Sequence, residues 1–263
     1  MTAFLLIHGI PGSSATWDAV AARLRDDDHE VLVPDLLGFG GEPLPGTADG
    51  LLAPEQARHV LGTLDRAGVD RVIVAGHDFG GPVAAHLVAD TPERVVALAL
   101  FSTNAFPDTP IPFPLSAVTL PVAGPAAERL LFSRPSLAMM LRRGVGRPPV
   151  RLDPDRYIGN GRSRRAIATI FAASLRRLRE LYTPVEAALR TVTVPAVVGW
   201  GDRDPFFPVA LGERTARLVP GARFRLYAGA GHFVPAERPA EVAADLLELA
   251  AVAQSQEPDS SQT

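Results

Sequence analysis

The sequence predicts an α/β fold with a doubly wound, mostly parallel sheet, and three observations carry this prediction. Six short runs of apolar and β-branched residues are each followed within two positions by Gly, Pro or Ser. Helical patterns separate most of these runs, and one proline-rich stretch interrupts the alternation. Short buried strands that alternate with helices are typical of a parallel sheet covered on both faces. A chain of 263 residues is long enough for one such domain with a large insertion.

The expected strands are short and end where turn residues begin. They lie at residues 4–7, 31–33, 72–75, 95–101, 196–198 and 223–227. Helices are expected at residues 17–25, 54–67, 80–89 and 239–250. The last of these carries Val242, Leu246 and Leu249 at helical spacing. Because parallel strands end at the same edge of a sheet, we expect the ligand site beyond their carboxyl ends.

The stretch from residue 104 to residue 190 differs from the rest of the chain. It opens with the proline-rich run PDTPIPFPLSAVTLPVAGP, which prevents regular helix or strand, and continues with helical patterns at residues 128–143 and 163–182. It holds 14 arginines and 6 acidic residues, whereas the remainder holds 12 arginines and 23 acidic residues. We therefore predict a core domain (residues 1–103 and 191–252), an inserted helical cap (residues 104–190) and a flexible tail (residues 253–263).

The composition excludes several kinds of chemistry. The chain has no cysteine, and all 26 basic residues are arginine because lysine is absent. Disulfides, thiol nucleophiles, cysteine zinc sites, Schiff bases and phosphate-loop lysines are therefore excluded. No HExxH motif or carboxylate cluster indicates a metal, and a net charge of −3 indicates no nucleic-acid surface. We expect a protein that uses neither a metal nor another cofactor.

The sequence carries no signal for secretion or for membrane insertion. The opening run MTAFLLIHGIPG has no charged leader region, and no stretch approaches the ~20 apolar residues of a membrane span. We expect a cytoplasmic protein that acts on a small molecule and has neither nucleic acid nor a membrane as a partner. The sequence leaves the oligomeric state open.

The strongest local motif is VAGHDFGG at residues 74–81, between an expected strand and an expected helix. It follows the small-x-nucleophile-x-small pattern of a nucleophile elbow, where glycines allow a sharp turn and the central side chain projects from the sheet edge. The central residue is Asp78. The alternative is that Asp78 only caps the following helix, since aspartate is a favourable N-cap. The later segments GDRDP (residues 201–205) and GHF (residues 231–233) give the order nucleophile, acid, histidine, which favours the elbow.

These motifs resemble those of the α/β-hydrolase superfamily, and the resemblance covers essentially the whole chain. It rests on the segments HGIPGSSATW, PDLLGFG, VAGHDFGGPVA, GWGDRDPFFP and AGAGHF. An aspartate at the elbow resembles the branch of epoxide hydrolases and haloalkane dehalogenases, whereas esterases of the superfamily carry serine there.

The resemblance implies a catalytic role for three side chains. Asp78 aligns with the nucleophile, His232 with the base, and Asp204 with the acid that orients the base. Asp202 is the rival for the position of the acid.

The resemblance also implies an oxyanion hole. The backbone N–H groups of Ile10 and Phe79 align with its two donors. His8 is expected to support the turn that carries Ile10, and His77 is expected to be structural.

An aspartate nucleophile leads to a hydrolysis in two steps. Aspartate is ionised at neutral pH, so Asp78 can displace a leaving group from an sp³ carbon without a base. The product is an alkyl ester of Asp78, and His232 then draws a proton from the water that attacks the ester carbonyl. The oxyanion hole serves this second step, where the loss of one donor costs about 10²–10³ in rate.

The leaving group stays open at this point, with an epoxide favoured over a halide. The resemblance implies that an epoxide oxygen takes a proton from tyrosines of the cap, for which Tyr157 and Tyr182 are the candidates. It implies that a halide is held by N–H donors, but the side chain of Phe79 has none and Trp17 and Trp200 lie outside the expected cap. A haloalkane or haloacid dehalogenase is the alternative, and a non-hydrolytic binding protein on the same fold is a third hypothesis.

Six arginines of the expected cap allow two interpretations. They either bind an anionic group of the substrate bidentately or form a solvated helix face beside an apolar stripe. They are Arg162, Arg164, Arg165, Arg176, Arg177 and Arg179. We expect a largely apolar small-molecule substrate, with an added anionic group as the alternative.

Overall fold

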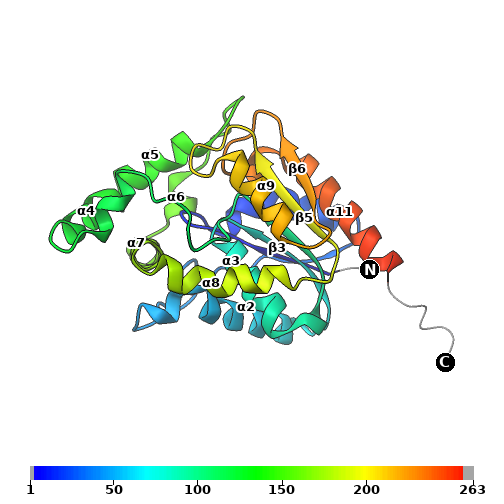
Figure 1. Cartoon of the computed structure of the whole chain (residues 1–263). Coiled ribbons are helices and arrows are strands. Elements are labelled where there is room, and N and C mark those ends of the chain that lie inside the picture. The colour runs from blue at the N-terminus through cyan, green and yellow to red at the C-terminus, as the bar shows by residue number, and fades with distance from the viewer. Residues whose placement is uncertain (1–2, 257–263) are drawn as a thin grey trace.

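Six parallel strands form a single sheet at the centre of the molecule (Figure 1). The computed structural model describes residues 3–256. The strands are β1 (Ala3–Ile7), β2 (Glu30–Leu32), β3 (Val72–His77), β4 (Val95–Phe101), β5 (Ala196–Gly201) and β6 (Arg223–Tyr227). Their order in the sheet is β2-β1-β3-β4-β5-β6, and every neighbouring pair is parallel. The parallel α/β sheet predicted from the short apolar runs is confirmed.

Helices cover both faces of this sheet. The α-helices are α1 (Asp18–Asp26), α2 (Ala53–Ala67), α3 (Gly80–Asp90), α4 (Gly124–Leu131), α5 (Arg134–Gly144), α6 (Pro154–Ile158), α7 (Gly161–Arg176), α8 (Leu178–Arg190), α9 (Val209–Leu218), α10 (Val234–Glu237) and α11 (Pro239–Ser255). Four short 3₁₀ segments are η1 (Ser14–Trp17), η2 (Asp49–Leu51), η3 (Pro92–Arg94) and η4 (Leu115–Thr119). Helix α1 packs against α11, whereas α3 packs against both α2 and α8.

The sheet separates two apolar clusters because side chains alternate along each strand. On β1, Leu5 and Ile7 belong to one cluster, and Phe4 and Leu6 belong to the other. All four side chains are fully buried. Burial on both faces is the reason why these strands form continuous apolar runs in the sequence.

Helices α4 to α8 occupy the part of the chain between β4 and β5, where the sequence predicts an inserted cap. The helical pattern at residues 128–143 is divided between α4 and α5, with Pro135 in the first turn of α5. Proline fits this position because the N–H that it lacks has no partner in the first turn of a helix. Figure 1 shows α4 and α5 projecting from the rest of the molecule, whereas α8 lies along α3.

The C-terminal end of the described chain is helical. Helix α11 continues to Ser255, past residue 252, where the sequence predicts that the core ends. Residues 257–263 of the predicted tail lie outside the described residues. Among residues 3–256, no helix is both long enough and apolar enough to cross a membrane.

Candidate functional site

Asp78 lies in the tight turn between β3 and α3. Its φ angle of 52° falls in the left-handed region, which costs backbone strain for any residue except glycine. A Cβ atom on Gly76 would lie 2.3 Å from the carbonyl oxygen of Gly80, and one on Gly80 would lie 2.3 Å from that of Ile7. The turn therefore requires glycine at both positions, which accounts for the motif at residues 74–81.

Asp78, His232 and Asp204 form one chain of polar contacts at the carboxyl edge of the sheet. The Nε2 atom of His232 lies 3.4 Å from Oδ2 of Asp78, and its Nδ1–H donates to Oδ2 of Asp204 at 2.9 Å. The other oxygen of Asp204 accepts the backbone N–H groups of Phe206 and Phe207, at 2.8 and 3.0 Å. The structure thus brings together three predicted site residues that follow β3, β5 and β6.

Asp202, the rival for the position of the acid, makes a different contact. Its Oδ1 atom accepts the backbone N–H of Gly229 at 2.7 Å, and the residue is exposed. The side chain of Asp204 is fully buried. The geometry therefore favours Asp204 as the partner of His232.

Two carboxylates control the charge of His232. Burial alone lowers the pKa of its imidazole, but the charge and hydrogen bond of Asp204, together with Asp78, outweigh burial and raise this pKa to about 10. Burial favours the neutral form of Asp204, yet His232 and the two backbone N–H groups hold the pKa of this carboxyl below its usual range. At neutral pH, His232 is therefore an imidazolium between two carboxylates.

His77 precedes Asp78 in the chain and holds the backbone of His232. Its Nε2–H donates to the carbonyl oxygen of His232 at 2.9 Å. Full burial and the charge of His232 lower the pKa of His77 to about 4, so its ring is neutral at pH 7. This contact agrees with the structural role that the sequence predicts.

The loop after β1 lies beside Asp78 because the strand order changes direction between β1 and β3. The backbone N–H of Ile10 donates to Oδ1 of Asp78 at 2.7 Å. His8 is fully buried, its Nε2 accepts the N–H of Leu36 at 3.1 Å, and burial lowers its pKa. Phe79 stands at the N-cap of α3, where the N–H groups have no partner within the helix.

The two candidate tyrosines lie in different surroundings, and the charge of Asp78 acts on Tyr182. The hydroxyl of Tyr182 lies near the side chains of Ser174 and Asn104, and burial together with the charge of Asp78 raises its pKa. Tyr157 is buried, packs edge-on to Phe233 and lines a different pocket of about 240 Å³. Burial raises the pKa of Tyr157 to about 12.

Asn104 and Ser174 are site residues that the sequence reasoning missed. Asn104 lies three residues beyond the end of β4, and its buried amide is held by two hydrogen bonds of 3.1 Å with the backbone of Phe106. A polar residue just beyond the carboxyl end of a central strand is a signal that could have identified it. Ser174 carries no such signal, because it lies within a long helical pattern.

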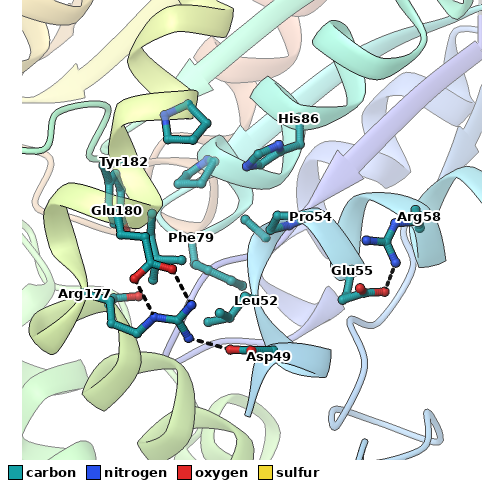
Figure 2. Close-up of a pocket in the computed structure, with 15 residues that line it drawn as sticks. Asp49, Leu52, Pro54, Glu55, Arg58, Phe79, His86, Arg177, Glu180 and Tyr182 are labelled. Carbon is teal, nitrogen blue, oxygen red and sulfur yellow. Dashed lines mark hydrogen bonds and ion pairs between the residues drawn. The ribbon is translucent and has the colours of Figure 1, made fainter. Parts of the chain in front are cut away.

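A pocket of about 320 Å³ lies between α2, α3 and α8 (Figure 2). Its wall is largely apolar and includes Leu52, Pro54, Phe79, Pro82, Leu181 and Pro184. Tyr182 also lines it, and Figure 2 shows Arg177 at its edge, paired with Asp49 and Glu180. Phe79 and Tyr182 thus belong both to this pocket and to the surroundings of Asp78.

Two of the candidate anion-binding arginines are occupied by carboxylates of the protein. Arg176 pairs with Glu128 at 2.8 Å, and Arg177 pairs with Asp49 and Glu180. These contacts support the interpretation of a solvated helix face for this part of the expected cap, with its arginines paired to carboxylates.

The two tryptophans belong to the core. The indole N–H of Trp200 donates to the carbonyl oxygen of Phe207 at 3.0 Å. Trp17 is fully buried and packs edge-on to Phe101. Within residues 3–256, no three His, Asp or Glu side chains gather into a group that could hold a metal ion.

Comparisons with known proteins agree with the observed fold. A family described as "alpha/beta hydrolase fold" matches residues 2–239. The chain is 28% identical to epoxide hydrolase A of Mycobacterium tuberculosis, over 93% of this chain and 89% of that protein. It is also 28% identical to haloalkane dehalogenase 2 of Mycobacterium bovis, over 93% of this chain and 86% of that protein. The crystal structure of an ancestral haloalkane dehalogenase superposes on this chain with a TM-score of 0.80. The superposition covers 97% of this chain and 92% of that protein. Because the two sequences are only 20% identical, this similarity supports the fold alone.

Proposed function

The chain belongs to the α/β hydrolase fold family, and on that premise we propose that it is a hydrolase that opens epoxides through an alkyl ester of Asp78. The observation that carries this proposal is the environment of the two carboxylate oxygens of Asp78. Oδ1 accepts the N–H of Ile10, whereas Oδ2 lies 3.4 Å from His232. An oxygen held by a backbone donor is suited to become the carbonyl oxygen of an ester, and the other is left to attack.

In the first step, Oδ2 of Asp78 attacks one carbon of the epoxide, and the bond from that carbon to the ring oxygen breaks. The oxygen takes a proton as it leaves, and the hydroxyl of Tyr182 is the donor that we assign. Its raised pKa keeps this hydroxyl protonated, and the nearby side chains of Ser174 and Asn104 orient it. The products of this step are the ester and a new hydroxyl group.

In the second step, His232 takes a proton from water, and the oxygen of this water attacks the carbonyl carbon of the ester. Negative charge then develops on Oδ1, which already lies on the N–H of Ile10 and would gain the N–H of Phe79 as a second donor. Collapse of the intermediate releases a diol and restores the carboxylate of Asp78. Asp204 holds Nδ1–H throughout, so that Nε2 is the atom that accepts the proton.

The charge of His232 changes between these steps. In the resting protein, Asp78 is one of the two carboxylates that raise its pKa to about 10. Esterification removes the charge of Asp78, so the pKa of His232 falls while the ester exists. The proton that His232 then releases restores the hydroxyl of Tyr182, and the neutral imidazole is the base of the second step.

An epoxide is favoured over a halide because of the donors that surround Asp78. The hydroxyl of Tyr182 is close enough for the charge of Asp78 to raise its pKa, whereas the N–H of Trp200 is bound to Phe207 and Trp17 lies in the core. Haloalkane dehalogenation by the same ester is the second candidate, and the relative named haloalkane dehalogenase 2 supports retaining it.

We propose a substrate class on the basis of the pocket that Phe79 and Tyr182 line. Its volume is about 320 Å³ and its wall is largely apolar, which suits the hydrocarbon part of a small epoxide, although Asp78 itself is not part of the lining. We assign residues 104–190 as a cap that covers this pocket, since Ser174 and Tyr182 come from α7 and α8.

The variant His232→Gln tests the ester mechanism directly. It removes the base but leaves the attack of Asp78 possible, so we expect a stable adduct whose mass equals that of the added epoxide. Intact-mass spectrometry after incubation with a panel of epoxides and haloalkanes would detect the adduct. Diol and halide, measured separately with the wild-type protein, would identify the leaving group.

The double variant Asp78→Asn with His232→Gln is the control, because it lacks the nucleophile as well as the base. We expect no adduct from it. An adduct that persists in the double variant would assign the nucleophile to another residue, and no adduct across the whole panel would contradict both the epoxide and the halide proposals.

A further inference from the structure

Exposed apolar side chains gather in one part of the cap, residues 113–144, which we call the arm. The arm contains η4, α4 and α5. Seven large apolar side chains are exposed within residues 3–256, and five of them lie in the arm: Phe113, Leu120, Val122, Leu130 and Met139. Val122 is 94% exposed and Phe113 is 85% exposed. Single exposed apolar residues are common on protein surfaces, but such a concentration marks an interaction site.

Three exposed apolar residues lie on α4 and in the turn before it. Ala126 and Leu130 are four residues apart and therefore lie on one face of the helix, and Val122 lies in the turn two residues before the helix begins. All three are exposed. The solvent-facing side of a helix normally carries polar residues. Exposure to water alone therefore does not account for these apolar side chains.

Unpaired arginines lie next to these apolar side chains. Arg129 is adjacent to Leu130 on α4, and Arg142 and Arg143 lie one turn beyond Met139 on α5. Among residues 3–256, no carboxylate forms an ion pair with any of these three arginines.

The arm has a charge opposite to that of the whole chain. It holds four arginines and a single acidic residue, Glu128, while the chain has a net charge of −3. Glu128 pairs with Arg176 of α7, and the fourth arginine of the arm, Arg134, pairs with Asp155. The charged side chains of the arm that have no ion-pair partner are therefore all positive.

We propose that the arm binds the surface of an anionic lipid bilayer, with its apolar side chains in the interfacial region and its arginines at the headgroups. Apolar residues combined with free cationic side chains are what peripheral membrane-binding helices present. A symmetric contact with a second copy would place this positively charged patch against itself, so the charge favours an anionic surface over a dimer. The sequence predicts no membrane partner, and the lack of a spanning helix concerns crossing of a bilayer and not binding to its surface.

The arm is anchored beside the proposed active site. Gly144, at its C-terminal end, accepts the backbone N–H of His232 at 2.6 Å. Figure 1 shows α4 at the far end of the arm, away from the sheet. Substitutions on α4 can therefore test lipid binding without changing the residues around Asp78.

Co-sedimentation with vesicles tests this proposal. We expect the full chain to sediment with vesicles of phosphatidylcholine and phosphatidylglycerol at low salt, and to bind less to phosphatidylcholine alone or at high salt. The double variant Val122→Ser with Leu130→Ser should weaken binding at least about tenfold, because two apolar side chains no longer enter the interface. Arg129→Gln should weaken it about fivefold, the effect typical of one cation near an anionic membrane.

Matched controls exist outside the arm. Leu226→Ser changes an apolar side chain of β6 that is 51% exposed, and Arg23→Gln changes an exposed arginine of α1 that forms no ion pair within residues 3–256; neither should alter binding. All variants should keep the wild-type melting temperature, which excludes misfolding as the cause.

Three results would overturn the proposal. They are no binding to anionic vesicles, equal losses in the arm variants and the control variants, and concentration-dependent self-association that the double variant abolishes. The last would identify a second copy of the chain as the occupant. None of these results depends on hydrolysis, so the proposal stands or fails separately from the proposed function.

Discussion

Replacement of Asp204 by asparagine isolates the part that this buried carboxylate plays in water activation. In the protein, Oδ1 of Asp204 accepts two backbone N–H groups and Oδ2 accepts Nδ1–H of His232. The amide oxygen of asparagine can keep both backbone contacts, and the amide nitrogen then faces His232. Nδ1 must become the acceptor, so the ring proton moves to Nε2. With Nε2 protonated, His232 cannot take a proton from water.

The size of the expected effect is that of losing a general base. Asp204 contributes both charge and a hydrogen bond to the raised pKa of His232, so this pKa falls below about 10 in the variant. Removal of a positioned general base costs about 10²–10⁴ in rate, and we expect hydrolysis of the ester to slow by that factor. Formation of the ester needs no base, and Tyr182 can regain its proton from water in the variant, so this step should stay within about tenfold of the wild-type rate.

Rapid quenching followed by intact-mass spectrometry measures the two steps separately. In the Asp204→Asn variant, the ester on Asp78 should accumulate to near one equivalent and decay slowly. Asp202→Asn is the matched control, because the same chemical change is made on an exposed carboxylate that contacts only the N–H of Gly229 in the loop that follows β6. The reasoning is refuted if Asp204→Asn turns over at the wild-type rate, or if both variants lose activity equally.

Three further predictions concern the proton donor, the turn and the charge of the base. Tyr182→Phe should slow ester formation from an epoxide by about 10²–10⁴, whereas Tyr157→Phe should leave it within about threefold, and single-turnover kinetics would compare them. Gly76→Ala places a Cβ atom 2.3 Å from the carbonyl oxygen of Gly80, so the backbone must move; we expect a loss of roughly 1–3 kcal/mol in the free energy of unfolding by urea. Because folding raises the pKa of His232 from 6.5 to about 10, the stability that it contributes is complete below pH 6.5 and is lost as the pH rises toward 10. The unfolding free energy of the wild-type protein should therefore decline over this range more steeply than that of His232→Gln, and equal slopes would contradict the raised pKa.

Features set by local sequence could be predicted, whereas features set by the position of the cap could not. The strands are short apolar runs because both faces of the sheet are covered, and the elbow is visible because close approaches to Ile7 and Gly80 leave room only for glycine. The choice between Tyr157 and Tyr182 had no local signal. That choice depends on how α8 packs along α3, and these two helices are about a hundred residues apart in the chain.

The choice between Asp202 and Asp204 could be predicted only in part from local sequence. Both residues belong to the same loop, but only Asp204 accepts the N–H groups two and three residues ahead. Such local contacts are typical of aspartate in turns and orient its second oxygen away from the turn. His232, however, reaches that oxygen from a different loop, which no local pattern reveals.

The proton held by His232 connects the two steps of the proposed reaction and separates the two candidate leaving groups. At neutral pH, the resting site contains an imidazolium and two carboxylates. When an epoxide opens, its oxygen must gain one proton. In the proposed reaction Tyr182 donates that proton, and the imidazolium replaces it and becomes neutral. The same event therefore forms the ester and prepares the base that hydrolyses it. A halide leaves without a proton, so with a haloalkane the imidazolium must first release its proton to solvent. The charges around His232 thus suit an epoxide, since the first step then requires no proton exchange with water.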